Sequence, residues 1–268
     1  MSRFPARIAV SALLVLALSA CSSTPPRQAA AEGTPPFTLE RFRDEQKLGE
    51  GVRTIVLDNP YGEIQVRQTQ AGAIAIQGVE QRIGETPRTA RIEWFEEDTR
   101  QGVRIRYAEH DPETPANPRL GRVDLYAFVP PGLRVELRSD FGAIVVRRID
   151  DEVVARSRAG SITVAARGAM DLESTEGQVR AWTMSADWSG PVRLVAGGGV
   201  LVDVPLFLPL DLQASAVDGI RADFEIASLV QGADGRWQAR HRIGEATIPL
   251  RIESGADITL QGVTVRRR

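Results

Sequence analysis

A short unit made of a glycine, one spacer residue and then isoleucine or valine recurs along this chain. Its clearest copies begin at Gly142, Gly160, Gly177 and Gly198, at intervals of 18, 17 and 21 residues. Looser copies occur at three further glycines, Gly62, Gly219 and Gly255. This recurrence constrains the fold more than any other feature, because units that repeat at such an interval pack against one another in a repeated way.

Each copy lies between two short runs in which apolar residues alternate with polar ones, as in Val135-Glu136-Leu137 and Ile162-Thr163-Val164. A period of two predicts β-strands, and the glycines predict turns in which a positive φ is needed. A unit of this length cannot bury its own apolar side, but stacked units can bury a continuous strip. We therefore predict an all-β fold, a single-stranded parallel β-solenoid of short glycine-punctuated rungs. An antiparallel meander or sandwich with turn glycines is the alternative.

Three segments depart from the repeat. Residues 37–48, FTLERFRDEQKL, could form one or two helical turns. Residues 90–110 predict an antiparallel hairpin, with Trp94 on one arm and Ile105 on the other, inside an insertion at about 80–121 that caps the N-terminal end of the solenoid. After Val204 the pattern loosens, because Pro205 and Pro209 interrupt it.

The first twenty residues have the features of an export signal. Arg3 and Arg7 precede an apolar run at residues 8–20 that contains no charged residue. As a helix this run would span only about 20 Å, well short of a hydrocarbon core of about 30 Å, which favours a signal peptide over a transmembrane anchor. The run ends in the sequence Leu18-Ser19-Ala20-Cys21, which resembles the lipobox of bacterial lipoproteins. That resemblance implies cleavage before Cys21 and attachment of diacylglycerol and palmitate chains to this cysteine.

The expected domain organisation follows from these features. Residues 1–20 form the signal peptide, residues 21–36 form a tether rich in proline, serine and alanine, and residues 37–268 form the solenoid body. Several acyl chains anchor a protein stably to a membrane. By analogy with lipoprotein sorting, Ser22 favours the outer membrane, and the leaflet that the body faces stays open.

The serial units also carry a family resemblance. Residues 123–168 contain a Val-Pro-Pro-Gly step at 129–132, then a strand, then successive units of strand, glycine and aliphatic residue. This order resembles the auto-transporter adhesin head-like domains of bacterial envelope proteins, over roughly residues 52–265 and best between 122 and 200. The resemblance implies a β-helix of unestablished biochemical role. The word adhesin comes from the family and not from these residues.

Few residues could carry chemistry. Cys21 is the only cysteine, so the folded body has neither a disulfide nor a thiolate metal site. His110 lies near Asp111 and Glu113, an arrangement typical of a solvated loop that could also hold a cation, whereas His241 stands between two arginines and is a poor metal ligand. We predict no cofactor and no metal. The net charge of −2 gives no reason to expect a nucleic-acid partner.

Enzyme activity has one possible basis, a pair of carboxylates on adjacent rungs that could cleave a polysaccharide. The candidate acids are Asp140, Asp150, Asp151, Asp171 and Glu173. Most of them fall where turns are expected, and no long loops are present to build a groove around them. The run 197–199 of three glycines is interpreted as a turn and not as a phosphate-binding loop, because no Lys-Ser/Thr follows. We therefore predict no catalytic residue.

Binding is the remaining class of function. Trp182 and Trp188 flank the turn at 177–190 and could stack on a glycan, although large apolar residues more often cover sheet faces. Arg266, Arg267 and Arg268 could contact anionic lipid. The favoured hypothesis is a non-catalytic envelope lipoprotein with a glycan or protein partner. The alternatives are a polysaccharide-cleaving solenoid and an accessory sensor of an envelope-stress system.

Overall fold

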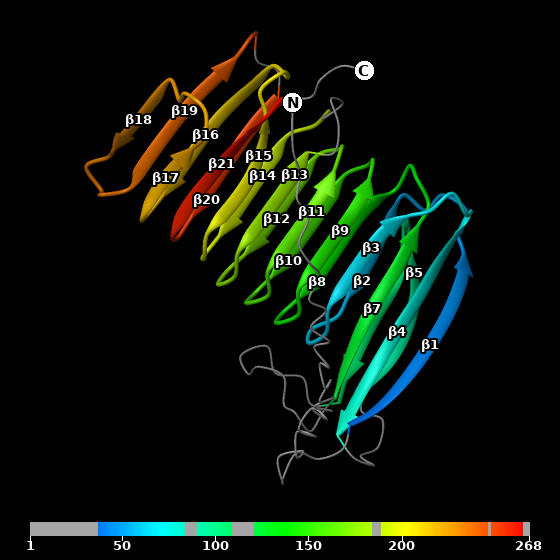
Figure 1. The fold of residues 1–268 in the computed structure, drawn as a ribbon. Helices are drawn as coiled ribbons and strands as arrows, with labels where there is room; N and C mark the ends of the chain where they lie inside the picture. Colours follow the sequence, from blue (N-terminus) through cyan, green and yellow to red (C-terminus); the bar gives the residue numbers. More distant parts are fainter. Residues whose placement is uncertain (1–36, 84–89, 109–120, 184–188, 246–247, 265–268) are drawn as a thin grey trace, which may run out of the picture. The chain divides into compact units, whose positions relative to one another are not determined.

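The computed structural model describes residues 37–83, 90–108, 121–183, 189–245 and 248–264. The described residues all belong to one compact unit, Pro36–Arg268. Every regular element among them is a β-strand, which confirms the all-β prediction (Figure 1). They include no helix that could cross a membrane. The predicted signal peptide, Cys21 and the predicted tether lie outside the described residues.

The strands form two large sheets. In spatial order, sheet 1 contains β1 (Phe37–Lys47), β4 (Ala73–Ile83), β7 (Arg122–Val129), β3 (Ile64–Gln68), β9 (Ile144–Ile149), β11 (Ile162–Ala166), β13 (Val179–Thr183), β15 (Val200–Pro205), β21 (Asp257–Val263) and β17 (Gly219–Ala222). Sheet 2 contains β18 (Ser228–Gln231), β19 (Trp237–Ile243), β16 (Leu210–Ala216), β20 (Ile248–Ser254), β14 (Val192–Ala196), β12 (Met170–Ser174), β10 (Val153–Ser157), β8 (Arg134–Ser139), β2 (Thr54–Asp58), β6 (Arg100–Tyr107) and β5 (Ala90–Glu97).

In the middle of the molecule the chain alternates between the sheets. Strands β8, β10, β12 and β14 are successive parallel neighbours in sheet 2, and β9, β11, β13 and β15 are successive parallel neighbours in sheet 1. We call one strand of each sheet together with the turn between them a rung. The rungs are in register, so that Val135, Val153, Met170 and Val192 form one row across sheet 2.

The stack ends differently from its middle, and both sheets are mixed. In sheet 1, β4 pairs antiparallel with both β1 and β7. In sheet 2, β5 pairs antiparallel with β6 at one end, and β19 pairs antiparallel with both β16 and β18 at the other. A parallel solenoid along the whole body is therefore not confirmed. Antiparallel hairpins take over where no further rung is available to accept a parallel strand.

The spatial order of the rungs also differs from the serial order that the repeat predicts. Strand β20 pairs in parallel with both β14 and β16, so the last strands of the chain lie between two earlier rungs. At the other end, β2 lies between β6 and β8. The loosened pattern after Val204 coincides with the first of these departures. After β15 the chain leaves a gap beside β14 in sheet 2 and continues with β16, and β20 later fills that gap.

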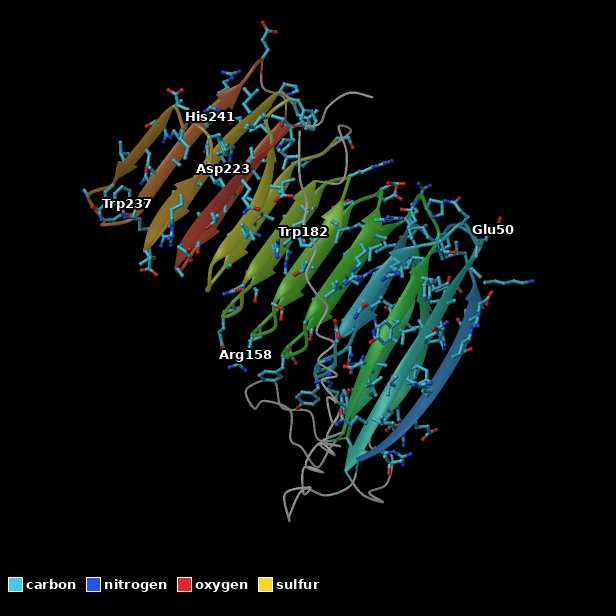
Figure 2. The ribbon with its side chains drawn as sticks, in the orientation of Figure 1. Glu50, Arg158, Trp182, Asp223, Trp237 and His241 are labelled. Carbon is cyan, nitrogen blue, oxygen red and sulfur yellow. The ribbon has the colours of Figure 1, made fainter. Side chains whose placement is uncertain are left out.

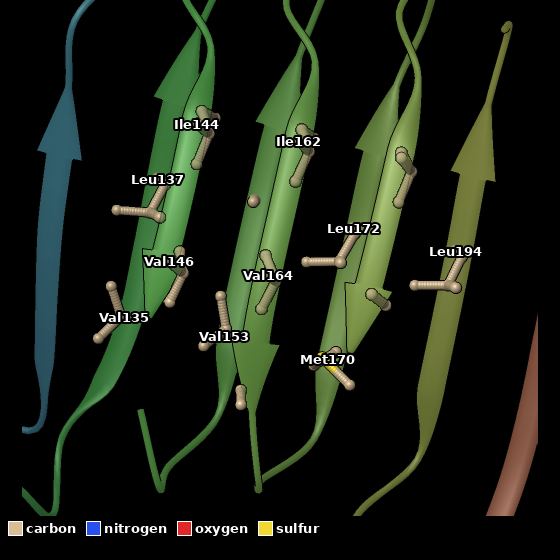
Figure 3. Packing of buried hydrophobic residues seen from close by; sticks show 14 of the residues in the cluster. Val135, Leu137, Ile144, Val146, Val153, Ile162, Val164, Met170, Leu172 and Leu194 are labelled. Carbon is tan, nitrogen blue, oxygen red and sulfur yellow. The ribbon is translucent and has the colours of Figure 1, made fainter. Parts of the chain in front are cut away.

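The core lies between the sheets (Figure 3). Leu137, Leu172 and Leu194 point inward from sheet 2, and Ile144 and Ile162 point inward from sheet 1; each has 1% exposure or less. The alternation of buried and partly exposed residues, such as BiBiB along β10 and β12, is the period of two expected for a strand with one face in the core. The repeat thus builds one continuous apolar layer.

Two local expectations had different outcomes. The helical turns considered at residues 37–48 are wrong, because β1 is an eleven-residue strand paired along its whole length with β4. Tertiary pairing outweighs the helix-favouring Glu, Arg, Gln and Lys of this segment.

The hairpin predicted at 90–110 is confirmed as β5 and β6, where Trp94 stands opposite Val103 and Ile92 opposite Ile105.

The repeated glycines lie at bends, except Gly219, which begins β17. The reason given for them, a positive φ, is wrong for Gly142, Gly160 and Gly177, which are absent from the positive-φ residues. A Cβ on Gly160 would instead lie 2.0 Å from the carbonyl oxygen of Gly142, and one on Gly142 would lie 1.8 Å from that of Gly62. These glycines form a column because stacked corners approach too closely for a side chain.

Candidate binding surface

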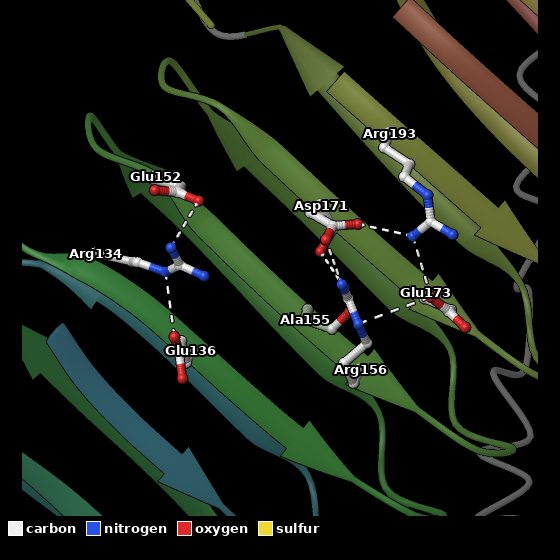
Figure 4. Close-up of polar contacts among 8 residues, drawn as sticks. All are labelled: Arg134, Glu136, Glu152, Ala155, Arg156, Asp171, Glu173 and Arg193. Atoms are coloured by element: carbon white, nitrogen blue, oxygen red, sulfur yellow. Dashed lines mark hydrogen bonds and ion pairs between the residues drawn. The ribbon is translucent and has the colours of Figure 1, made fainter. Parts of the chain in front are cut away.

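The outer face of sheet 2 holds the acids that could have formed a catalytic pair. Asp171 and Glu173 lie two residues apart on β12 and point to the same side (Figure 4). The Arg193 guanidinium contacts both carboxylates, at 3.0 Å from Asp171 Oδ1 and 3.1 Å from Glu173 Oε2. Arg156 forms ion pairs with the same two residues from the opposite neighbouring strand. The pair is therefore held between two arginines.

The electrostatics of Asp171 oppose general-acid catalysis by this residue. Partial burial raises the pKa of Asp171, but the hydrogen bonds from Arg156 and Arg193 outweigh it, so that the pKa lies below its ordinary value. A general acid that protonates a glycosidic oxygen needs a raised pKa, as a carboxyl group has in an apolar pocket. Asp171 and Glu173 serve as ion-pair partners of Arg156 and Arg193.

The other candidate acids are dispersed over turns. Asp150 forms an ion pair with Arg167 at 3.3 Å and accepts a hydrogen bond from Gln68 Nε2 at 3.1 Å. Asp151 accepts a hydrogen bond from the backbone N–H of Gly132 at 2.7 Å. Asp140 lies at the turn between β8 and β9. These three aspartates therefore lie at turns and not on the outer face of β12, where Asp171 and Glu173 lie.

The remaining sequence candidates were not brought together. His241 lies on β19, where its Nδ1 accepts a hydrogen bond from the Ala227 N–H at 3.3 Å. Within the described ranges, no group of three or more His, Cys, Asp or Glu side chains is placed to hold a metal ion. The three glycines at 197–199 form the bend between β14 and β15, as interpreted. His110, Trp188 and the three terminal arginines lie outside the described residues.

The outer face of sheet 1 carries a groove over the same rungs. It has a volume of about 560 Å³ and crosses β11, β13, β15 and β21. Its outward side chains are mainly hydroxyl and amide groups, with one arginine, one aspartate and one leucine among them. The polar members include Ser161, Thr163, Gln178, Arg180, Thr259 and Gln261. The volume falls in the range of small-ligand sites, about 300–1,000 Å³.

Trp182 stands beside this groove, two residues after Arg180 on β13 (Figure 2). Its side chain is 38% exposed, and the Arg180 guanidinium carbon lies 4.3 Å from the centre of the Trp182 ring. The cation–π contact orients both side chains. In the neighbouring strand Trp182 is paired with Ala165, a small residue that faces outward and is only 8% exposed.

The other described tryptophans have structural roles. Trp94 and Trp237 are partly buried against the core, and Trp94 Nε1 donates a hydrogen bond to Asp44 Oδ2 at 2.7 Å. The general expectation that large aromatic residues cover sheet faces therefore holds for these two. Among the tryptophans that the structure describes, Trp182 alone is strongly exposed.

Sequence reasoning missed the residues that complete these surfaces. Arg180 and Gln178 were not singled out, although both occupy alternate, outward positions beside the Gly177 turn. It also missed a serine three residues before each of the three glycines Gly142, Gly160 and Gly177, at Ser139, Ser157 and Ser174. The Ser174 hydroxyl donates to the Gly160 carbonyl at 2.8 Å and accepts from the Gly177 N–H at 3.0 Å. The Ser-x-x-Gly spacing was available as a signal.

Comparisons with known proteins give a limited result. No family model matches the chain, and no curated protein matches it. A crystal structure described as "a putative cell adhesion protein" from Clostridium sporogenes has 10% identity and a TM-score of 0.47, over 84% of this chain and all of that chain. Two described as "putative adhesin", from Bacteroides fragilis and Parabacteroides distasonis, have 11% and 9% identity and TM-scores of 0.29 and 0.26. Each of these two also covers 84% of this chain, and 97% of its own. Similarity at this level assigns neither a family nor a function.

Proposed function

We propose that this chain is a non-catalytic lipoprotein of the bacterial outer membrane, anchored through Cys21, whose stacked β body presents sheet faces for binding. The lipobox-like sequence Leu18-Ser19-Ala20-Cys21 and the following tether support the anchor. The parallel, in-register rungs from β8 to β15 support a solenoid in the middle of the body, closed off by antiparallel hairpins.

One observation carries the binding role. The acids that sequence reasoning offered for polysaccharide cleavage are paired with arginine on sheet 2, whereas sheet 1 offers a groove of polar side chains beside an exposed tryptophan. The arginines on sheet 2 lower the pKa of Asp171, which makes this residue a poor general acid. The groove on sheet 1 provides contact area and hydrogen-bonding groups for a ligand. Together they favour recognition over bond cleavage.

The anchor is tested in a Gram-negative host that expresses the full chain. We expect labelled palmitate to be incorporated and the protein to sediment with outer membranes. The Cys21→Ala variant should lose the label and accumulate uncleaved, whereas Ser23→Ala, a nearby change outside the cleavage motif, should be processed normally. Equal labelling of the Cys21→Ala variant would show that the anchor assignment is wrong.

The absence of catalysis is tested separately with the purified full chain in detergent. We expect no release of reducing ends from a panel of bacterial polysaccharides. Turnover that is abolished by Asp171→Asn or Glu173→Gln would replace the binding role by an enzymatic one.

A further inference from the structure

We infer that the groove on the outer face of sheet 1, together with Trp182, binds a neutral oligosaccharide. This inference rests on the proposed function, because it names the ligand class of the binding body. It arises from three observations: the register of the groove side chains, their free hydrogen-bonding capacity, and the exposed aromatic ring at one side.

The register places one row of side chains across four neighbouring strands. Thr163 on β11 is paired with Arg180 on β13, Arg180 with Leu201 on β15, and Leu201 with Thr259 on β21. Neighbouring strands are about 4.8 Å apart, so the row extends about 14 Å. The site therefore suits an extended chain of several sugar units that crosses the strands, more than it suits a single sugar.

The groove side chains keep their hydrogen-bonding groups for a ligand. Within the described residues, no hydrogen bond or ion pair engages the side chains of Thr163, Gln178, Thr259 or Gln261. The guanidinium of Arg180 contacts the Trp182 ring and interacts electrostatically with Asp203, and no hydrogen bond or ion pair engages it within these residues. Hydroxyl and amide groups both donate and accept, which is the complement that the hydroxyl groups of a sugar require.

Polar side chains without a partner are found on the groove face of these rungs, and the opposite face differs. On the other side of the same rungs, Arg156 and Arg193 neutralise Asp171 and Glu173. Likewise, Arg251 is 2.8 Å from Asp211 farther along the stack. On these rungs the outward charged groups of sheet 2 are paired with one another. On sheet 1 Asp257 is paired with Arg221 at 3.3 Å, but the hydroxyl and amide groups of the groove are left without a side-chain partner among the described residues.

Trp182 and the charge of the groove specify the class of sugar. The indole ring offers an apolar surface for the C–H face of a pyranose, and Arg180 holds it in place at 4.3 Å. Leu201 adds a second apolar contact within the groove. The lining contains one arginine and one aspartate, Arg180 and Asp257. Beside them Arg221 pairs with Asp257 at 3.3 Å and Asp203 interacts with Arg180, so the charges around the groove balance. A neutral glycan is therefore favoured over an acidic polymer or a nucleic acid.

The inference is tested by calorimetric titration of the full chain in detergent with three tetrasaccharides: chitotetraose, maltotetraose and tetragalacturonate. We expect at least one neutral tetrasaccharide to bind, and to bind more tightly than tetragalacturonate. Trp182→Ala should weaken that binding about tenfold, the scale expected for the loss of one ring contact. Leu39→Ala is the control, since it removes another exposed apolar residue, at the far edge of sheet 1, and should leave affinity unchanged.

A second variant guards against misfolding of Trp182→Ala. Thr259→Ala removes one groove hydroxyl from a strand and should weaken binding a few-fold while the circular dichroism spectrum stays unchanged. Absence of binding by either neutral tetrasaccharide at millimolar concentrations, preference for tetragalacturonate, or unchanged affinity in both groove variants would overturn the inference. Palmitate labelling at Cys21 and the absence of turnover do not depend on that result, so the proposed function can survive the loss of its sugar ligand.

Discussion

At the corners of the stacked strands, the absence of a side chain makes room for a carbonyl oxygen of the preceding rung. The ideal Cβ position on Gly142 is 1.8 Å from the oxygen of Gly62, and the positions on Gly160 and Gly177 are 2.0 and 2.5 Å from the oxygens of Gly142 and Gly160. The obstructing atoms are backbone, which cannot rotate away as a flexible side chain can. Only a shift of the whole corner relieves such an overlap.

We therefore expect Gly160→Ala to lower the free energy of unfolding by about 1–3 kcal/mol, the range for overpacking. Gly72→Ala is the matched control, because no atom lies within 4 Å of the Cβ that it would add and its φ is not positive. Its effect should stay within about 0.5 kcal/mol. Urea denaturation followed by circular dichroism measures both. Equal effects of the two substitutions would show that corner crowding is unimportant.

At the scale of the turn, two neighbouring serines differ in their bonding. Ser157 on β10 and Ser174 on β12 stand in register, three residues before Gly160 and Gly177. Ser174 Oγ makes two hydrogen bonds, whereas the buried Ser157 Oγ has no hydrogen-bond partner among the described residues. Ser174→Ala should cost about 1 kcal/mol of stability and leave the Gly160 carbonyl without that donor. Ser157→Ala, the matched change one rung away, should be neutral or stabilising. Urea denaturation measures the loss of stability in both variants. A larger loss for Ser157→Ala than for Ser174→Ala would contradict these hydrogen-bonding roles.

At the scale of the strand face, the ion pairs of β12 predict a pH dependence. The pKa of Asp171 is lowered in the folded protein, so its stabilising contribution is complete above its ordinary value of 3.8 and is lost as the pH falls through the lower, folded-state value. Asp171→Asn should therefore be less stable than the wild type at pH 7, and the difference should shrink between about pH 5 and pH 2. Asp218→Asn, which alters an exposed aspartate, should show no such convergence. A constant difference at every pH would contradict the ion-pair contribution.

The elements show what could be predicted from sequence. The strands β8 to β15 and the bends at Gly142, Gly160 and Gly177 followed from apolar alternation and spacing, because both features depend on local sequence. The strand β1 was considered as helix, because its pairing with β4 joins residues that are far apart in the sequence. Asp171 and Glu173 were identified as candidates, but the arginines that neutralise them come from other strands.

The groove was harder to predict than the strands. Trp182 was considered as a glycan contact, whereas Arg180, Leu201 and Thr259 were not connected with it. Their connection depends on the register across four strands, and β21 reaches the groove only because the last strands of the chain lie beside β15. A serial repeat would have placed a different rung there. The composition of the groove therefore depends on an order of strands that the repeat does not specify.

At the scale of the whole molecule, a stack in which each rung contacts mainly its neighbours should unfold unevenly. Edge strands β17 and β18 have four residues each, and every residue of β18 is exposed. Their amide hydrogens should exchange faster than those of the central strands β11 and β12. Because Leu172 is fully buried in β12, Leu172→Ala should cost about 2–5 kcal/mol.

The added exchange in Leu172→Ala should concentrate in β10, β12 and β14 and in the sheet 1 strands opposite them. It should be much smaller in β1 and β5, which lie at the other end of the stack. Hydrogen exchange followed by mass spectrometry provides the measurement, with Leu39→Ala as a control that leaves the core intact. If the variant instead loses protection equally in every strand, the body unfolds as a single cooperative unit, and stability is not passed from rung to rung.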